Sequence, residues 1–300
     1  MADKRNLLLI DGMALLFRAF YATAATGQFM YNDAGTPTNA VNGFLKHLFL
    51  AVNHFRPTHI AVCWDMGSKT FRNDLYPDYK GNRGAPPEEM IPQFDLAKDT
   101  VAAFGITNVG VVGFEADDVL GTIANLSREE ADVVILTGDQ DILQVLDDGI
   151  DVALLKKGFG NYELVTKEMF IAERGYEPKQ FIDVKGLTGD TSDNYPGVKG
   201  IGPKTAEKLI REFSSIDKLL QSLHLLTATQ RKKIEADKDL LVLSKTLAEI
   251  KLDVPLSFSL QDAKINFSDT VNVPLLKKLD IKGMSRILPM IEDWTNSKIS

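Results

Sequence analysis

The sequence predicts an α/β fold in which a mostly parallel central sheet is covered by helices on both faces. Two observations support this prediction. Short apolar runs of strand length alternate with longer stretches of helical periodicity, and an acidic residue follows each apolar run. A continuous apolar run is typical of a strand that is buried on both faces, as in a parallel sheet. Strands are predicted at residues 7–10, 60–64, 109–112 and 133–136, and helices at residues 40–53 and 117–126.

Two further regions follow a different pattern. Between residues 71 and 105, aromatic and basic residues and a Pro-Pro pair precede a charged helical stretch, and we expect a mobile excursion that covers the site. After about Tyr176 the strand signals fade, and short helices separated by Gly and Pro dominate. The chain is therefore predicted to form an α/β core over residues 1–174, a helical module over residues 175–255, and a C-terminal helical segment over residues 256–300 that packs on the core.

Length and composition limit the class of protein. The 300-residue chain has 44% hydrophobic residues and a single cysteine, Cys63, which lies in an apolar run and is expected to be a buried, inert thiol. The apolar run near the N-terminus is too short for a signal peptide, and no stretch of roughly 18 apolar residues occurs. These features favour a soluble, cytoplasmic protein without a membrane partner.

The formal net charge of −7 does not exclude nucleic acid as a partner, because the distribution of charge matters more than its sum. Between Lys199 and Lys251, eleven Lys and Arg residues outnumber seven Asp and Glu residues. Clustered basic residues neutralise the phosphates of DNA. The helical module is therefore the basic part of the chain.

Each predicted strand is followed by a carboxylate. Asp11 follows the first strand, Asp65 the second, Glu115 the third and Asp139 the fourth. In open parallel sheets, ligands bind outside the carboxyl ends of the strands. We therefore expect four separate segments of the chain to deliver carboxylates to one crevice.

More acids lie beside these four, and together they require counter-ions. Carboxylates gathered in a partly buried crevice repel one another, and each desolvated charge costs several kcal/mol. All-oxygen ligands without His or Cys select hard ions such as Mg²⁺, with Mn²⁺ as a substitute. Two such ions roughly 4 Å apart can clamp a phosphodiester that is being hydrolysed. The candidate metal ligands are Asp11, Asp65, Glu115, Asp117, Asp118, Asp139, Asp141, Asp190 and Asp193.

A structural interpretation stays open for each acid taken alone. An Asp after a strand is commonly a turn former or a helix N-cap, and acids in a first helical turn are favoured by the helix dipole. A calcium loop around Asp139 and Asp141 is excluded, because the Gly and the Glu that the twelve-residue loop requires are absent. The concentration of nine acids near strand ends favours a metal site over turns.

A glycine-rich segment follows the last acids, at residues 197–206. It is not a P-loop, because Pro203 stands where that loop needs a lysine. The pattern favours a helix-hairpin-helix turn, in which backbone N–H groups at the start of the next helix bind a DNA phosphate; an ordinary connection between helices is the alternative. The candidate DNA-binding residues are Gly197, Val198, Lys199, Gly200, Ile201, Gly202, Lys204 and Thr205.

Two basic residues in the excursion are candidate catalytic cations. Lys80 and Arg83 follow Tyr79, and they would reach a phosphate in the crevice if the segment covers it. A cation at that place stabilises the negative charge that develops in the transition state. Taken alone, the segment fits a solvated loop equally well.

Taken together, these motifs resemble the bacterial and phage 5′ nuclease family, which includes flap endonucleases and the 5′→3′ exonuclease domain of bacterial DNA polymerase I. The resemblance covers nearly the whole chain. It rests on Leu-Ile-Asp-Gly, Trp-Asp, Tyr-Lys-Gly-Asn-Arg, Phe-Glu-Ala-Asp-Asp, Thr-Gly-Asp-Gln-Asp, Gly-Asp-Thr-Ser-Asp-Asn and Gly-Ile-Gly-Pro-Lys-Thr-Ala.

The resemblance implies a PIN-like nuclease core whose carboxylates are divided between two Mg²⁺ ions. The first ion would be held by Asp11, Asp65, Glu115, Asp117 and Asp118. The second would be held by Asp139, Asp141, Asp190 and Asp193, with Asp190 acting through water. Some family members lack the second set, which this chain retains.

The resemblance also assigns roles to the basic residues and to the glycine-rich turn. Lys80 and Arg83 match basic residues at the base of the family's helical arch, near residues 71–105 here, through which a 5′ single strand passes. The turn at residues 197–202 resembles the family's helix-three-turn-helix (H3TH) element, which binds duplex DNA and often a K⁺ ion through main-chain carbonyls.

The implied activity is cleavage of 5′ flaps and recessed 5′ ends in DNA replication and repair, including RNA primers in RNA–DNA hybrids. A DNA polymerase and a ligase would act on the same substrate, and the protein would be a monomer. No polymerase region follows residue 300, so we expect a free-standing nuclease or a piece of a larger enzyme. Two alternatives stay open: a PIN-like RNase that acts on structured RNA, and a non-catalytic module that binds branched DNA.

Overall fold

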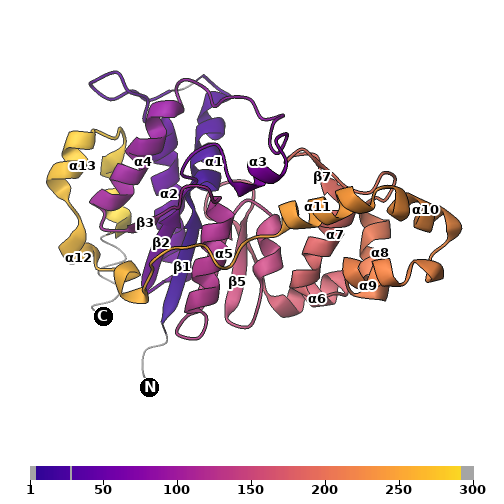
Figure 1. The fold of residues 1–300 in the computed structure, drawn as a ribbon. Coiled ribbons are helices and arrows are strands. Elements are labelled where there is room, and N and C mark those ends of the chain that lie inside the picture. Colours follow the sequence, from indigo (N-terminus) through magenta and orange to yellow (C-terminus); the bar gives the residue numbers. More distant parts are fainter. Residues whose placement is uncertain (1–4, 28, 292–300) are drawn as a thin grey trace.

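The central sheet has six strands in the order β3-β2-β1-β4-β5-β6 in the computed structural model, which describes residues 5–27 and 29–291. Five strands are parallel, and β6 pairs antiparallel with β5. Helices cover both faces (Figure 1), which confirms the predicted α/β fold class. The strands are β1 (Asn6–Asp11), β2 (His59–Cys63), β3 (Thr107–Val109), β4 (Asp132–Thr137), β5 (Ile150–Leu155) and β6 (Tyr162–Val165).

Two groups of helices enclose the sheet, each with its own apolar cluster. One face carries α1 (Gly12–Ala24), α2 (Asn39–Phe55) and α4 (Ile91–Ala103). The other carries α5 (Ala116–Ser127), the 3-10 helix η1 (Asp141–Val145) and α6 (Lys167–Arg174). The sheet is therefore the middle of three layers.

Side chains of β1 alternate between these two clusters. Leu7 and Leu9 pack on the α5 face, whereas Leu8 and Ile10 pack on the α2 face. All four are almost completely buried. Because the strand is covered on both faces, it forms a continuous apolar run, and this made it recognisable in the sequence.

The other strands differ partly from the prediction. The third strand lies at residues 107–109 rather than 109–112, so it begins two residues earlier than predicted and ends at the predicted first residue. The strands β5 and β6 are not predicted at all. Asp151 interrupts the apolar run of β5, and β6 is a short edge strand that exposes Glu163 and Leu164.

The sequence suggested a single excursion over residues 71–105, but the structure divides this segment into three parts. It begins with α3 (Phe71–Leu75), continues through turns over residues 76–90, and ends in α4. Ala97, Val101 and Phe104 are fully buried in the same cluster as α2, so α4 belongs to the wall of the core. The stretch without regular helix or strand is therefore confined to residues 76–90.

The helical module consists of short helices around a small hairpin. Pro203 occupies the first turn of α8, and its Ala206, Leu209, Ile210 and Phe213 are buried at helical spacing. The elements are η2 (Pro178–Gln180), α7 (Phe181–Thr188), β7 (Gly189–Asp190), β8 (Tyr195–Pro196), α8 (Pro203–Phe213), α9 (Ile216–Gln221), η3 (Leu223–Leu225), α10 (Ala228–Ala236) and α11 (Lys238–Ala248).

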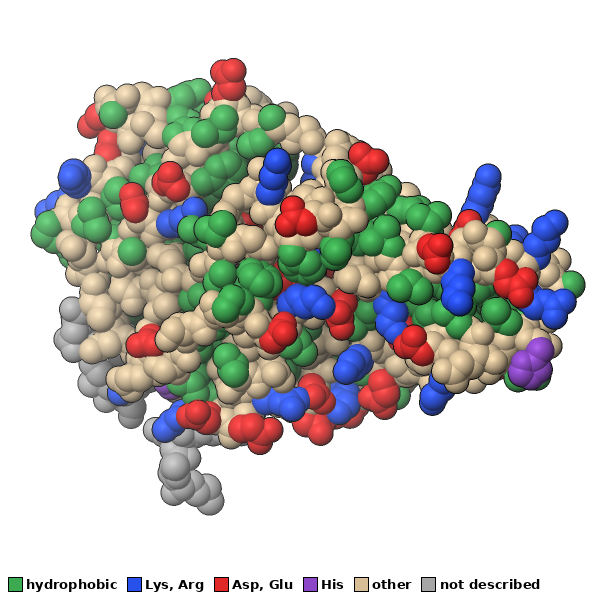
Figure 2. Space-filling model, viewed as in Figure 1, with side chains coloured by type: hydrophobic (Ala, Val, Ile, Leu, Met, Phe, Trp, Pro, Cys, Tyr) green, Lys and Arg blue, Asp and Glu red, His purple; other side chains and the backbone are tan. Residues whose placement is uncertain are grey.

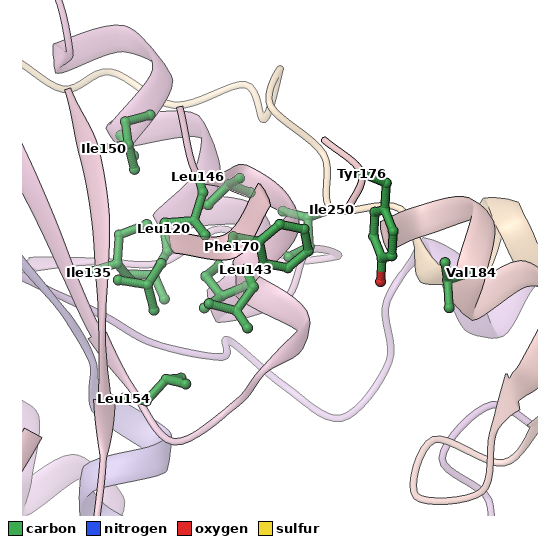
Figure 3. Close-up of a cluster of buried hydrophobic side chains, with 14 of the residues drawn as sticks. Leu120, Ile135, Leu143, Leu146, Ile150, Leu154, Phe170, Tyr176, Val184 and Ile250 are labelled. Atoms are coloured by element: carbon green, nitrogen blue, oxygen red, sulfur yellow. The ribbon is translucent and has the colours of Figure 1, made fainter. Parts of the chain in front are cut away.

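One apolar cluster runs from the sheet into the module (Figure 3). Ile135 and Leu154 belong to the sheet, Phe170 belongs to α6, and Tyr176 and Val184 lead into the module. Because the side chains of this cluster are closely packed from the sheet to the module, the module has a defined place relative to the sheet. The acids at the start of the module are thereby fixed relative to the strand ends.

The C-terminal segment packs beside the core helices. Leu276 and Ile281 join the cluster that contains α2 and α4. The elements are η4 (Leu260–Ala263), α12 (Phe267–Thr270), α13 (Val273–Leu279) and η5 (Met284–Arg286). Of the predicted segment over residues 256–300, residues 292–300 lie outside the described residues. Within the described ranges, no helix has the length and apolarity that crossing a bilayer requires.

Candidate active site

Five carboxylates line one cavity of about 360 Å³ at the carboxyl edge of the sheet. Asp11 ends β1, Asp65 lies two residues beyond β2, and Asp139 lies two residues beyond β4. Glu115 is the N-cap of α5, and Asp117 lies in its first turn. The topology thus brings together side chains that are up to 128 positions apart in the sequence, from Asp11 to Asp139.

Asp11 is held in place by two hydrogen bonds. One carboxylate oxygen accepts from the backbone N–H of Ala14 at 2.9 Å, and the other accepts from the Thr137 hydroxyl at 2.7 Å. Burial, together with the negative charges of Asp65 and Asp139, raises the pKa of Asp11 to about 6 despite these bonds. The carboxylate is therefore rigidly placed but electrostatically unfavourable.

Asp117 is in a still less favourable environment. Burial, followed by the charges of Asp139 and Asp11, raises its pKa well above the usual value. Among the described residues, no Lys, Arg or His forms an ion pair with Asp11, Asp65, Asp117 or Asp139. We call these four residues the core set. Within the part of the chain that the structure describes, their negative charge is therefore not balanced by an ion pair.

Asp141, Asp190 and Asp193 lie outside that cavity and have basic partners. We call them the module-side set. The Lys185 ammonium is 2.7 Å from Asp141 and forms a hydrogen bond with Asp190. Burial opposes ionisation of Asp190, but hydrogen bonds from Lys185 and Ser192 lower its pKa to about 2.

Asp141 connects the two sets. Its backbone N–H donates to the carboxylate of Asp139 at 2.9 Å. Burial and the charge of Asp139 raise the pKa of Asp141 to about 6, although Lys185 acts in the opposite direction. The module-side set therefore adjoins the core set, and the contact between them is the hydrogen bond from Asp141 to Asp139.

Lys80 and Arg83 line the same cavity as the core set. The Lys80 ammonium is 2.8 Å from Glu115 and 3.8 Å from Asp193, and the Arg83 guanidinium pairs with Asp193. Lys80 has a φ of 56°, and its N–H donates to the Asp193 carbonyl at 2.8 Å. The structure therefore places both predicted cations at the site.

Tyr79 links the core to the module beneath these cations. Its buried hydroxyl lies 2.9 Å from the Asp193 carboxylate and 3.2 Å from that of Glu115. Its ring packs against Tyr195 with centroids 6.2 Å apart. Tyr79 thus fixes the two acids relative to each other.

Asp118 does not belong to the cavity, and this corrects the prediction that it binds the first ion. Its side chain is completely buried, and both oxygens accept hydrogen bonds from the Arg72 guanidinium at 2.8 Å. They also accept from the backbone N–H groups of Glu115 and Lys251. Arg72 in turn donates to the carbonyls of Leu247 and Glu249. Asp118 is therefore the centre of a structural polar network.

The chemistry of the core set fits Mg²⁺. Within the described part of the chain, no three His, Cys, Asp or Glu side chains are close enough to form a ready-made metal cage. Mg²⁺ does not require one, because it keeps several of its waters and is bound through one or two carboxylates. The cavity has room for water, and its carboxylates supply oxygen ligands only. Lys80 and Arg83 also line it but form their ion pairs with Glu115 and Asp193 rather than with the core set, so the cavity meets that requirement.

The glycine-rich turn lies between β8 and α8. A Cβ atom on Gly197 would lie 2.3 Å from the backbone nitrogen of Gly189, so this position accepts only glycine. Gly200 has a φ of +80°, in the left-handed region that favours glycine. Val198 and Ile201 were candidate DNA-binding residues, but their side chains are buried and do not offer a surface to DNA. These two residues anchor the turn.

Side chains of the α10–α11 corner brace this turn. The Asp237 carboxylate accepts from the Lys199 N–H at 2.8 Å, and the Lys233 ammonium donates to the Gly200 carbonyl at 2.8 Å. The N–H of Lys199 is therefore already used within the protein.

The start of α8 is open to a ligand. No side chain caps the helix at Gly202, and no atom lies within 4 Å of where a Cβ on Gly202 would stand. Lys204 and Thr205 follow in the first turn. Lys and Arg side chains are spread over this end of the molecule, with Asp and Glu among them (Figure 2). The helix N-terminus can therefore bind an anion.

Four residues that organise the site were missed by sequence reasoning. Thr137 ends an apolar strand directly before a Gly-Asp pair, and Tyr79 precedes a basic residue, so both carried a weak signal. Arg72 and Lys185 carried none, because their partners are distant in the sequence or lie across a turn.

Comparison with known families covers most of the chain. Residues 6–177 match the family "5'-3' exonuclease, N-terminal resolvase-like domain". Residues 176–270 match the family "5'-3' exonuclease, C-terminal SAM fold". The two matches meet at the point where the α/β core passes into the helical module.

Individual relatives agree with these matches. A 5′-3′ exonuclease of Bacillus subtilis (strain 168) is 57% identical over 286 residues, which are 95% of this chain and 97% of that protein. DNA polymerase I of Lactococcus lactis subsp. cremoris (strain MG1363) is 38% identical over 87% of this chain, which spans only 30% of the polymerase. A bacteriophage T5 flap endonuclease, solved with DNA and metal ions, has a similar fold with a TM-score of 0.66 and 22% identity, over 96% of this chain and 100% of that one.

Proposed function

Because the chain belongs to the 5′-3′ exonuclease family, we propose that it is a structure-specific 5′ nuclease that hydrolyses phosphodiester bonds with two Mg²⁺ ions. The observation that carries this proposal is the convergence of the core set in one cavity, where none of its four carboxylates forms an ion pair with a Lys, Arg or His of the described residues. Burial and mutual repulsion destabilise such a cluster unless cations enter it. A phosphodiester brings further negative charge to the cavity, which also requires cations.

The carboxylates divide between the two ions as follows. Asp11, Asp65 and Asp117 hold the first ion, with Glu115 beside them. Asp139 and the module-side set hold the second ion, and Mn²⁺ can replace Mg²⁺ at either position. When bound, the ions activate a water molecule as the nucleophile and stabilise the leaving oxygen.

The protein contributes position and charge to this reaction. Thr137 and the N–H of Ala14 hold Asp11 in one orientation. Lys80 and Arg83 present fixed cations at the cavity, where they stabilise the charge on the phosphate in the transition state. The N-terminus of α8, with Lys204 and Thr205, binds a backbone phosphate of the duplex without reading its sequence.

The substrates proposed are 5′ flaps and recessed 5′ ends of DNA, including RNA primers in RNA–DNA hybrids. The polymerase relatives support this choice, because the matching region forms part of DNA polymerase I. We propose that the protein acts as a cytoplasmic monomer on substrates that a DNA polymerase and a ligase also process. We also propose that the main-chain carbonyls of the turn bind a K⁺ ion. The Gly200 carbonyl accepts a hydrogen bond from the Lys233 ammonium, so other carbonyls of the turn would be the main ligands.

A cleavage assay tests this function. A 5′-labelled DNA flap, a blunt duplex and an RNA hairpin would each be incubated with the protein in Mg²⁺ or in EDTA. We expect cleavage of the flap near its junction in Mg²⁺ and no cleavage in EDTA. Preferential cleavage of the RNA hairpin would favour a PIN-like RNase, and binding of the flap without cleavage in any divalent ion would favour a non-catalytic module.

A further inference from the structure

Lys185 lies between two carboxylates from different parts of the molecule. Its ammonium is 2.7 Å from an oxygen of Asp141 and donates a hydrogen bond to Asp190. Asp141 belongs to η1 in the core, whereas Asp190 belongs to β7 in the module. The Lys185 side chain is only 15% exposed. The helix α7 thus places a largely buried cation at the junction of the two parts.

This ammonium lies where a metal ion shared by Asp141 and Asp190 would lie. A charged hydrogen bond separates nitrogen and oxygen by about 2.7–2.9 Å. Mg²⁺ contacts its oxygen ligands at about 2.0–2.1 Å. An ion that bridged these two oxygens in the place of the ammonium would overlap it, so the ammonium must leave before an ion binds there.

The charges around the two metal positions also favour weaker binding of the second ion. At the first position, Asp11, Asp65 and Asp117 form no ion pair among the described residues, so an ion there meets uncompensated negative charge. At the second position this holds for Asp139 alone. In the module-side set, Lys185 pairs with both Asp141 and Asp190 and so offsets part of their charge, and Asp193 has Arg83 as its partner. An ion entering the second position therefore replaces a cation that is already present. The electrostatic free energy gained on binding is consequently smaller there than at the first position.

We propose that Lys185 is a built-in counter-cation of the second metal position, and that its ammonium competes with the second ion, which consequently binds more weakly than the first. Release of the ammonium requires only rotation of the flexible lysine side chain, because the four-carbon stem has several rotatable bonds. The helix α7 does not need to move. This inference depends on the proposed function only for the identity of the ions.

Equilibrium binding of Mn²⁺ tests this competition without reference to cleavage. Mn²⁺ would be titrated into the whole protein, without DNA, and free ion would be followed by electron paramagnetic resonance. We expect the wild type to show one tight and one weak class of site. In Lys185→Met, which is one atom shorter but keeps most of the apolar stem and removes the charge, we expect the weak class to tighten at least tenfold and the tight class to stay unchanged.

Two further variants identify the sites. Lys245→Met is the matched control, because Lys245 also bridges two carboxylates of the module, Asp183 and Asp217, at 3.0 and 2.9 Å but lies outside both metal sets. It should bind Mn²⁺ as the wild type does. Asp141→Asn removes one ligand of the second position, so the weak class should weaken further while the tight class stays unchanged.

Several outcomes would overturn the proposal. An unchanged weak class in Lys185→Met would show that the ammonium does not compete, and a weakened one would show that Lys185 supports the ion. Equal tightening in Lys245→Met would point to a general effect of charge. Absence of the tight class from the wild type would instead contradict the proposed metal-dependent function. Circular dichroism would confirm that each variant is folded.

Discussion

The two halves of the acidic crevice differ in how their charge is balanced. In the core set, Asp11 and Asp117 are buried among other acids, and burial raises the pKa of each. In the module-side set, Asp190 has a pKa lowered to about 2 by its bonds to Lys185 and Ser192, although burial acts against this. The first half has no ion-pair partner among the described residues, whereas the second is partly neutralised by Lys185 and Arg83, although Asp141, next to Asp139, keeps a raised pKa.

This difference indicates which half depends on added cations. A folded chain normally satisfies its buried charges, and exceptions concentrate at functional sites. The core set is such an exception, because its carboxylates are held by hydrogen bonds and by the strand ends but have no basic partner among the described residues. We infer that the first ion is essential to the site and that the second is more readily exchanged.

The largest expected effect is the loss of cleavage in Asp139→Asn. Asp139 belongs to the core set and is proposed to hold the second ion, and no Lys, Arg or His of the described residues forms an ion pair with it. We expect single-turnover cleavage of a flap in saturating Mg²⁺ to fall by about 10⁴-fold, which corresponds to roughly 5 kcal/mol. Asp141→Asn should lose markedly less, because Lys185 already balances that carboxylate. Asp95→Asn, on the exposed surface of α4, is the control. Equal losses at Asp139 and Asp141 would remove the distinction between the two halves.

The second-largest expected effect is a loss of stability in Asp118→Ala. Asp118→Ala leaves the Arg72 guanidinium buried without its ion-pair partner. We expect the free energy of unfolding in urea to fall by about 3–5 kcal/mol. Binding of Mn²⁺ by the folded protein should change little, since Asp118 does not line the cavity. A stable Asp118→Ala protein that has lost an ion would restore Asp118 as a ligand.

Lys80→Met tests the cation at the boundary between the halves. We expect the rate of the chemical step to fall by about 10²–10³-fold, or roughly 3–4 kcal/mol, as for the loss of one preorganised donor. Rapid-quench measurements with enzyme in excess would give this rate. Flap affinity in Ca²⁺ should change far less. A large loss of affinity with an unchanged rate would make Lys80 a binding residue only.

The smallest predicted effect concerns the open start of α8. Lys204→Ala should weaken duplex binding less than tenfold, or by about 1 kcal/mol, and should reduce the slope of log K against log salt by about 1. Fluorescence anisotropy across a range of KCl concentrations would measure both. Lys278→Ala on α13 is the control. An unchanged salt slope in Lys204→Ala would place the duplex elsewhere.

The core half of the site could be predicted from the sequence because its signals are local. Asp11 directly follows a strand that is buried on both faces, and the same holds, within two residues, for Asp65 and Asp139. The carboxyl ends of parallel strands meet at one edge, so topology brings these residues together. The fold class followed from the same apolar runs.

The module-side half was less predictable because it depends on partners that are distant in the chain. Lys185 meets Asp141 only after α7 packs beside η1, and no sequence pattern announces that contact. Asp118 was misassigned because it is adjacent to Asp117. Successive helix residues point in directions about 100° apart, so one acid faces the cavity and the other faces Arg72.

The dependence of the core set on added cations can be measured as the thermal stability of the wild type and of Asp117→Asn, each in EDTA and in Mg²⁺. We expect Asp117→Asn to melt at a higher temperature than the wild type in EDTA, because the repulsion within the core set is relieved. We also expect Mg²⁺ at about 100 times its Kd to stabilise the wild type by about 2.7 kcal/mol and the variant hardly at all. A wild type that Mg²⁺ does not stabilise, together with a variant that is less stable in EDTA, would contradict that dependence.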